Sequence, residues 1–234
     1  MAVATLAIGM IFIGGTFFTG VHFATLSTER TIATVAADEA FAKVRVYGIN
    51  LTDPNLATNR LIPFETLNPI ASNEFFYPSE KISGEKQYCW SALCRPVDSG
   101  SNNRLVQVTV FVSRKIGSGS KYWNPLYPFD MSKGIDRPVA LSVDVSLVGV
   151  DATGRAVLAI EAGKERWISP GYTIAEDSTG EIYRVIDNGV GLNEIVLDPA
   201  KAWPWAVAKV WVVPPAIGHG RGPCIEVYQG EVRF

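Results

Sequence analysis

The residues best suited to catalysis are few in this chain of 234 residues, which contains two histidines and three cysteines. A Ser-His-Asp triad needs a histidine base, and only His219 could serve, because His22 lies in a long apolar stretch. The loop around His219 is rich in glycine, but a phosphate-cradling glycine loop must open a helix, and Pro223 leads into a strand pattern instead. Gly117-Ser118-Gly119-Ser120 does not fit the nucleophile elbow. We therefore expect no enzymatic activity.

The cysteines and acidic residues give no clear metal or redox motif. Cys89 and Cys94 are five residues apart, so on a strand they point to opposite faces and a local disulfide would need a bulge. Zinc prefers four ligands, whereas His219 with Cys224 offers two. A disulfide that uses Cys224 and three buried thiols remain alternatives. Two acidic loops lack the dense ligand pattern of a calcium site, at Glu176-Asp177 and at Asp198. We expect no cofactor.

Aromatic residues alternate with prolines in residues 121–129, KYWNPLYPF. Such a loop can form contacts with a sugar, a surface or a partner subunit, and it can equally cap the core of its own domain. The candidates for partner contact are Tyr122, Trp123, Tyr127 and Phe129.

Composition limits the class of protein. Lys and Arg number 21 against 23 Asp and Glu, which gives a net charge of −2 and no basic footprint, so nucleic acid is not expected as the primary ligand. Hydrophobic residues make up 47% and charged residues 19%, which is too apolar for disorder, and three cysteines are too few for a disulfide scaffold.

The N-terminal segment is apolar and carries no charge from Met1 to Ser27. About 20 apolar residues suffice to cross a bilayer. A cleaved signal peptide fits poorly, since it needs basic residues before an apolar stretch of about 7–15 residues. We expect a helix that spans a membrane or packs in a filament core through Leu6, Ile8, Met10, Ile11, Phe12, Ile13, Phe17, Phe18, Val21 and Phe23.

The same helix is predicted to continue as an amphipathic half over residues 28–48. This stretch contains no proline, and Gly48 is a plausible stop. At 1.5 Å per residue, a helix over residues 1–48 would be about 70 Å long. One face is predicted to pack against a globular head through Ala33, Ala37, Ala40, Phe41 and Val44.

The remaining chain has the period-two pattern of strands, which makes the fold class α+β. Residues 49–150 are predicted to form the head, with a hairpin over 87–97 and 104–115 and a third strand over 138–150. This antiparallel sheet is expected to bury one face on the helix and to leave the other in water. Residues 151–234 are predicted to form a separate β-rich module, a small barrel or sandwich, with two D-x-T-G hairpin turns.

The apolar run AVATLAIGMIFIGGTFF and the Ala-rich half after it resemble the N-terminal helix of type IV pilins and of type II secretion pseudopilins, most of all the minor, PilV-like members. The resemblance covers the first 48 residues, about a fifth of the chain. Met1-Ala2-Val3-Ala4 resembles the stretch a few residues beyond the glutamate of the family's cleavage motif, a basic leader followed by Gly-Phe-Thr-Leu-x-Glu, so the sequence as given does not show the sites of peptidase recognition and N-methylation. We expect Met1 to be an internal methionine or the chain to be truncated.

The resemblance implies a structural subunit of a type IV pilus or type II secretion filament. Such a subunit waits in the inner membrane as a single-pass protein with an extracytoplasmic head, in contact with lipid. It then joins a cell-surface or periplasmic filament, and its partners are other pilin subunits and an assembly platform. The alternative is a membrane-anchored extracytoplasmic β domain that binds a surface ligand without polymerising. A helix that ends near Ser27 and leads into a flexible linker would favour this alternative.

Overall fold

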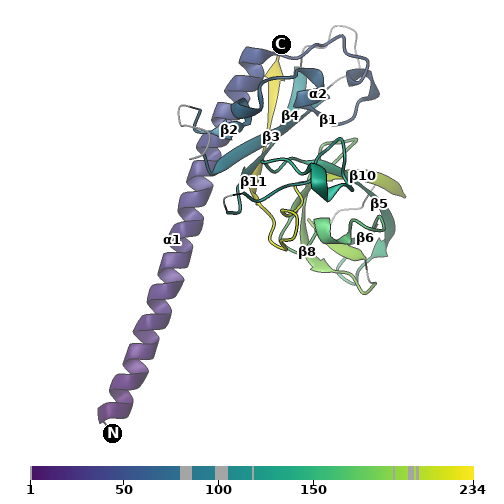
Figure 1. Ribbon diagram of the computed structural model, residues 1–234. Helices are drawn as coiled ribbons and strands as arrows, with labels where there is room; N and C mark the ends of the chain where they lie inside the picture. The colour runs from purple at the N-terminus through teal and green to yellow at the C-terminus, as the bar shows by residue number, and fades with distance from the viewer. Residues whose placement is uncertain are drawn as a thin grey trace.

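The computed structural model describes residues 2–79, 86–97, 105–117, 119–191, 193–199, 203 and 206–234, with side chains from residue 9 onward. One long helix, α1 (Ala2–Tyr47), extends away from a β-rich body that packs on its C-terminal half (Figure 1). The chain is therefore α+β, as predicted, and its described part contains antiparallel sheets.

α1 runs without interruption from the apolar run into the amphipathic one. It has 46 residues, which gives a rod about 70 Å long. It ends where predicted, because Gly48 adopts a left-handed conformation with φ +70° and its N–H donates to the carbonyl of Val44 at 3.0 Å. Arg45 lies in the last turn, where a positive charge interacts favourably with the helix dipole.

The sheet that packs on α1 has the strand order β1-β3-β4-β11, with β2 paired to β3. Its described strands are β1 (Ile62–Pro63), β2 (Phe76–Tyr77), β3 (Tyr88–Pro96), β4 (Leu105–Arg114) and β11 (Cys224–Arg233). β3 and β4 form the predicted hairpin. Short elements precede β3 in the chain: a 3-10 turn over Leu56–Thr58, α2 (Phe64–Leu67) and a 3-10 turn over Ser72–Phe75.

The core between α1 and this sheet follows the two sequence periods. Alternate valines of β4 are buried toward the helix at Val106, Val108, Val110 and Val112. The facing helix surface is nearly flat, because its buried residues are mostly alanine. The structure places Ala33, Ala37, Ala40 and Val44 in this core, packs the half-buried Phe41 against it, and adds Ala36.

Six of the described strands close into an antiparallel barrel in the order β10-β5-β6-β9-β8-β7, with β7 pairing back to β10. Their bounds are β5 (Leu141–Val150), β6 (Ala156–Ile160), β7 (Thr173–Glu176), β8 (Ile182–Asn188), β9 (Glu194–Asp198) and β10 (Val207–Val212). Short 3-10 turns lie at Met131–Lys133 and Glu165–Trp167. Inward side chains such as Val143, Leu158 and Leu197 form the barrel core.

Sheet membership differs from the prediction at two strands. β5 was predicted as a third strand of the head sheet, but it pairs with β6 and β10 in the barrel. The predicted domain boundary between residues 150 and 151 therefore separates β5 from its partner β6. β11, predicted within a C-terminal module, pairs with β4 and packs on α1. Both strands have the alternating pattern of any half-buried strand, and that pattern does not identify the pairing partner. The barrel is thus inserted between β4 and β11.

The second face of the helix-packed sheet was expected to be wet, and this was wrong. Phe111 and Thr109 are fully buried on it, because the barrel covers them. Polar contacts join the two layers: Arg95 Nη1 donates to the Ser178 carbonyl at 2.6 Å, and Gln229 Nε2 donates to the Gly180 carbonyl at 2.7 Å. The molecule is layered as helix, sheet and barrel.

Candidate functional site

The N-terminal half of α1 carries a run of large apolar side chains that the described chain leaves uncovered. In Figure 1 the ribbon of this half extends away from the β-rich body. These side chains are between 50% and 76% exposed, although all are aliphatic or aromatic: Met10, Ile11, Phe12, Ile13, Phe17, Phe18, Val21 and Phe23. The side chains of the other two predicted residues, Leu6 and Ile8, lie outside the described residues. α1 is long and apolar enough to span a membrane.

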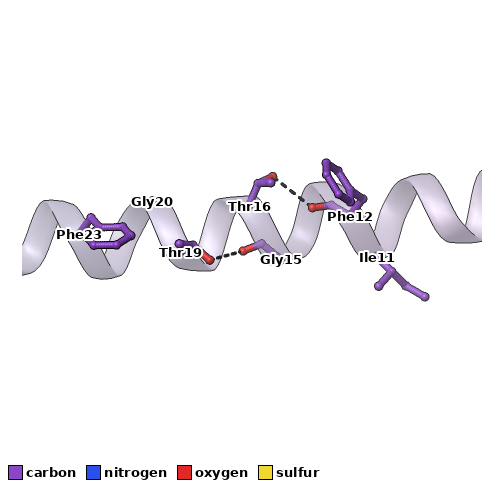
Figure 2. A pocket seen from close by; sticks show the side chains of 7 residues that line it. All are labelled: Ile11, Phe12, Gly15, Thr16, Thr19, Gly20 and Phe23. Carbon is purple, nitrogen blue, oxygen red and sulfur yellow. Dashed lines mark hydrogen bonds between the residues drawn. The ribbon is translucent and has the colours of Figure 1, made fainter.

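One face of this half carries a shallow groove, shown in Figure 2. Its floor is formed by small residues at helical spacing, Gly15, Thr16, Thr19 and Gly20, and large apolar side chains stand at its ends. A Cβ added at Gly15 or Gly20 would meet no atom of the described chain within 4 Å. Such a surface lets the backbone of a second helix approach closely.

The polar groups of the groove are already satisfied within the helix. Thr16 Oγ1 donates to the carbonyl of Ile13 at 2.9 Å, and Thr19 Oγ1 donates to that of Gly15 at 2.8 Å (Figure 2 shows the second of these bonds). The backbone amides and carbonyls of a helix satisfy one another. This half can therefore lie in a medium without water, whether lipid or the interior of a helix bundle. The sequence analysis did not identify this groove, although the spacing of Gly15 and Thr19, four residues apart on one helix face, is visible in the sequence.

The aromatic loop divides into a structural part and an exposed part. Tyr122 is buried, and its hydroxyl oxygen accepts a hydrogen bond from the Ile116 N–H at 2.7 Å, so it does not reach a partner. Trp123 is half-buried, with its ring centroid 5.3 Å from that of Trp167 at the barrel core. For Tyr122 the structure therefore supports the second alternative, in which the loop caps the core of its own domain, because its ring is buried and its hydroxyl is used inside the domain.

The remaining residues of the loop lie on the surface. Tyr127 and Phe129 are exposed, as are two neighbours that the sequence analysis did not select, Leu126 and Met131. Lys133 Nζ lies 3.8 Å from the centroid of the Tyr127 ring, a cation–π contact that orients the ring. These four exposed apolar side chains fall within residues 126–131, a cluster along the sequence that is available to a partner.

The three cysteines are free thiols. Cys89 on β3 and Cys224 on β11 both lie opposite Ser113 of the intervening strand β4. Two strand spacings, roughly 9–10 Å, therefore separate them, which exceeds the reach of a disulfide. Cys94 lies on β3, in the core beneath α1. Burial raises the pKa of each thiol to about 12, so all three are protonated at neutral pH.

The remaining polar candidates do not converge on a catalytic or metal centre. His219 lies in an exposed turn, where its backbone N–H donates to the Ala216 carbonyl at 2.9 Å. The described residues contain no group of three His, Cys, Asp or Glu side chains placed to hold a metal ion. Glu176 is buried, and its carboxylate accepts hydrogen bonds from Ser178 and Thr179 that hold the turn between β7 and β8. Asp198 forms an ion pair with Arg155 at 3.5 Å.

The candidate site is therefore a surface for packing: the apolar half of α1, with its groove, and the exposed cluster on the aromatic loop. Comparison of the chain with protein-family models, with curated proteins and with solved structures finds no match in any of the three.

Proposed function

We propose that this protein is a minor pilin or pseudopilin, a structural subunit of a type IV pilus or type II secretion filament that is stored in the inner membrane before assembly. One observation supports the proposal most directly. α1 begins as an apolar rod with all faces exposed and continues, as one helix, into the face that packs on the sheet. A rigid rod fixes the head relative to the membrane half, which a repeating filament requires.

The proposal gives the exposed half of α1 two successive environments. In the membrane, its apolar side chains lie in lipid and its hydroxyls remain satisfied by the helix itself. In the filament, the same surface is buried among neighbouring copies of the helix, and the groove at Gly15 and Gly20 allows close approach. Head-to-tail contacts that do not close into a ring generate a helical fibre.

The alternative remains an anchored extracytoplasmic β domain that binds a ligand without polymerising. The exposed apolar cluster of Leu126, Tyr127, Phe129 and Met131 is the observation that favours it, since such a cluster is typical of a contact surface. An anchor needs no rigid connection to its domain, whereas α1 continues for 20 residues beyond Ser27 to Tyr47. The continuous helix therefore favours the filament.

The decisive experiment follows the native protein in its own cells. Surface fibres are sheared, sedimented and probed for this chain, with a membrane protein of unrelated fold as the control for contamination. We expect the chain in the fibre fraction in wild-type cells and in the membrane fraction in cells that lack the assembly platform. A chain that stays in the membrane in both strains contradicts the filament and favours the anchored domain.

A cysteine at position 19 tests which surface the copies share. Cys89 and Cys94 are buried, Cys224 is half-buried, and the pKa of each thiol is raised to about 12, so the native thiols contribute little background. With a short bis-maleimide, Thr19→Cys in the groove is expected to give cross-linked dimers in assembling cells and few in cells without the platform. Val21→Cys lies on the opposite face of the same helix, so stronger cross-linking at position 19 than at position 21 in assembling cells would identify the groove as the closer contact. Equal cross-linking in both strains contradicts packing in a filament.

A further inference from the structure

The base of the head is the place where α1 leaves the sheet and its exposed half begins. α1 runs alongside β11 in the same direction: Arg30 Nε lies 3.9 Å from Glu226 Oε2, and the Thr34 hydroxyl lies 3.0 Å from that of Tyr228. The end of β4 reaches the helix at the same level, where Arg114 forms an ion pair with Glu29. These contacts place the beginning of the head at about residue 29 of α1.

A groove of about 380 Å³ lies at this base, between α1, the end of β4 and the loop that leads into β11. Four cationic side chains line it: Arg30, Arg114, Lys115 and Arg221. Two carboxylates, Glu29 and Glu226, each pair with one arginine. Arg221 is exposed and has no ion-pair partner among the described residues, and Lys115 lies over the Phe76 ring, with its Nζ 5.2 Å from the centroid.

The charge of the base is opposite to that of the rest of the chain. Four cations against two carboxylates leave it with +2, whereas the whole chain carries −2. The other 17 Lys and Arg and 21 Asp and Glu therefore give −4. Lys121 lies close to the same loop, because its carbonyl accepts from the Ile217 N–H at 2.8 Å, and it is also exposed. The excess of positive charge is concentrated where the helix emerges.

The length of the helix places this base at the level of phospholipid headgroups. The chain is uncharged up to Ser27, and about 20 residues cross the hydrocarbon core of a bilayer. The apolar exposed run ends at Leu26, one turn before Glu29 and Arg30, so the phosphate layer falls beside the base. Guanidinium groups bind phosphate with paired, charge-assisted hydrogen bonds.

We infer that the base of the head is a binding site for anionic phospholipid headgroups, such as phosphatidylglycerol, and that it holds the head against the membrane while the subunit is stored there. This inference rests on the proposed membrane storage of α1. Arg221 and Lys115 provide the charge that is not neutralised within the protein. Arg30 and Arg114 are partly satisfied by their carboxylates and complete the wall of the groove.

The test uses the full chain in nanodiscs that contain phosphatidylcholine alone or phosphatidylcholine with 30% phosphatidylglycerol. Native mass spectrometry counts the lipids that remain bound, and hydrogen exchange follows residues 114–117 and 221–225. We expect phosphatidylglycerol to be enriched among bound lipids, with slower exchange at the base. The double substitution Lys115→Gln with Arg221→Gln is expected to reduce the enrichment roughly tenfold, since two cations near an anionic surface are lost. High salt is expected to weaken it.

The matched control removes the same charge elsewhere, by Arg184→Gln on the barrel and Arg233→Gln at the far end of β11, and should leave the enrichment unchanged. Equal loss in both double variants, or no enrichment in the wild type, overturns the site. Slower exchange at the base with inorganic phosphate in phosphatidylcholine discs overturns the lipid and identifies a free anion as ligand. A chain that inserts but shows no lipid preference contradicts this inference alone. A chain that fails to insert contradicts membrane storage as well.

Discussion

The hydroxyl of Thr34 on α1 lies 3.0 Å from the phenolic oxygen of Tyr228 on β11, which joins residues 194 positions apart in the chain. The last strand of the protein therefore completes the sheet on which the first helix packs. The barrel lies between these two parts in the sequence and on the opposite side of the sheet in space. Folding of the helix-packed layer consequently requires both ends of the chain.

Substitution of a buried residue on β11 tests this requirement. Val232 is only 1% exposed in the core beneath α1, so Val232→Asp places an unpaired carboxylate there and is expected to cost about 3 kcal/mol or more. Urea unfolding in detergent micelles, followed by tryptophan fluorescence, measures the loss. The exposed neighbour Glu231 provides the control, because Glu231→Gln should change stability by less than about 0.5 kcal/mol. A stable Val232→Asp protein contradicts the role of β11 in this core.

The small residues on the packed face of α1 set its distance from the sheet. Ala40 is fully buried, so Ala40→Leu forces the helix and sheet apart and is expected to destabilise the head by about 1–3 kcal/mol. Ala42, two residues along the helix, is exposed, and Ala42→Leu should be nearly neutral. The midpoint of urea unfolding separates the two variants. Equal midpoints contradict the close packing of α1 on β3, β4 and β11.

The contact between barrel and sheet is tested by two glycines in matched turns. Gly154 and Gly180 end the two D-x-T-G turns, with φ of +79° and +72°. Gly154→Ala is expected to cost about 1–2 kcal/mol from the left-handed backbone alone. Gly180→Ala adds a Cβ only 2.6 Å from Gln107 Oε1, the atom that accepts from Arg95 Nε at 3.0 Å.

Displacing that amide breaks the Arg95 hydrogen bond, so Gly180→Ala should cost about 1 kcal/mol more than Gly154→Ala. Thermal unfolding of the two variants under the same conditions measures the difference. Equal losses of stability in the two variants would contradict the close contact between Gly180 and the side chain of Gln107 on the sheet.

The thiols provide a chemical test of the core. The pKa of each cysteine is raised to about 12 by burial, and the thiolate is the reactive form. At pH 8 the folded protein should resist iodoacetamide for hours, and all three cysteines should be alkylated in 6 M urea, as counted by mass spectrometry. Cys224, which is half-buried, is expected to react first as pH is raised. Rapid labelling of Cys89 or Cys94 at pH 8 contradicts their burial.

Local features of the fold could be predicted because they depend on residues near one another in sequence. The alanine spacing from Ala33 to Ala40 matches the buried face of α1, and Gly48 ends the helix in a left-handed conformation. The pairing of β11 with β4 could not be predicted, since β strands with the same alternation compete for a partner far along the chain. For the same reason the cover over Phe111 was missed, and the second sheet face was expected to be wet.

The candidate site divides in the same way. The exposed apolar residues of α1 follow from composition alone. The sequence left two roles open for Tyr122, because its hydrogen-bond donor, the Ile116 N–H, becomes visible only when the loop is folded. The positively charged groove at the base of the head could not be predicted, because Arg30, Arg114 and Arg221 are spread over 191 positions of a chain whose net charge is negative. Only the topology brings these three residues together.

Asp177 gives the protein a specific dependence on pH. Burial raises the pKa of this carboxyl above its ordinary value, although Trp211 Nε1 donates to it at 2.7 Å and Arg60 lies 3.8 Å away, both of which favour the ionised form. In the unfolded chain Asp177 ionises near its ordinary pKa of 3.8, so between that pH and the folded pKa the folded state holds more protons. Its contribution to stability therefore falls as pH rises through this window.

Asp177→Asn keeps the acceptor for Trp211 and removes the ionisation, so it should raise the stability at pH 7 relative to that at pH 4. Urea unfolding of both proteins from pH 4 to pH 7 measures this difference, and an unchanged pH profile would contradict the burial of Asp177 between barrel and sheet.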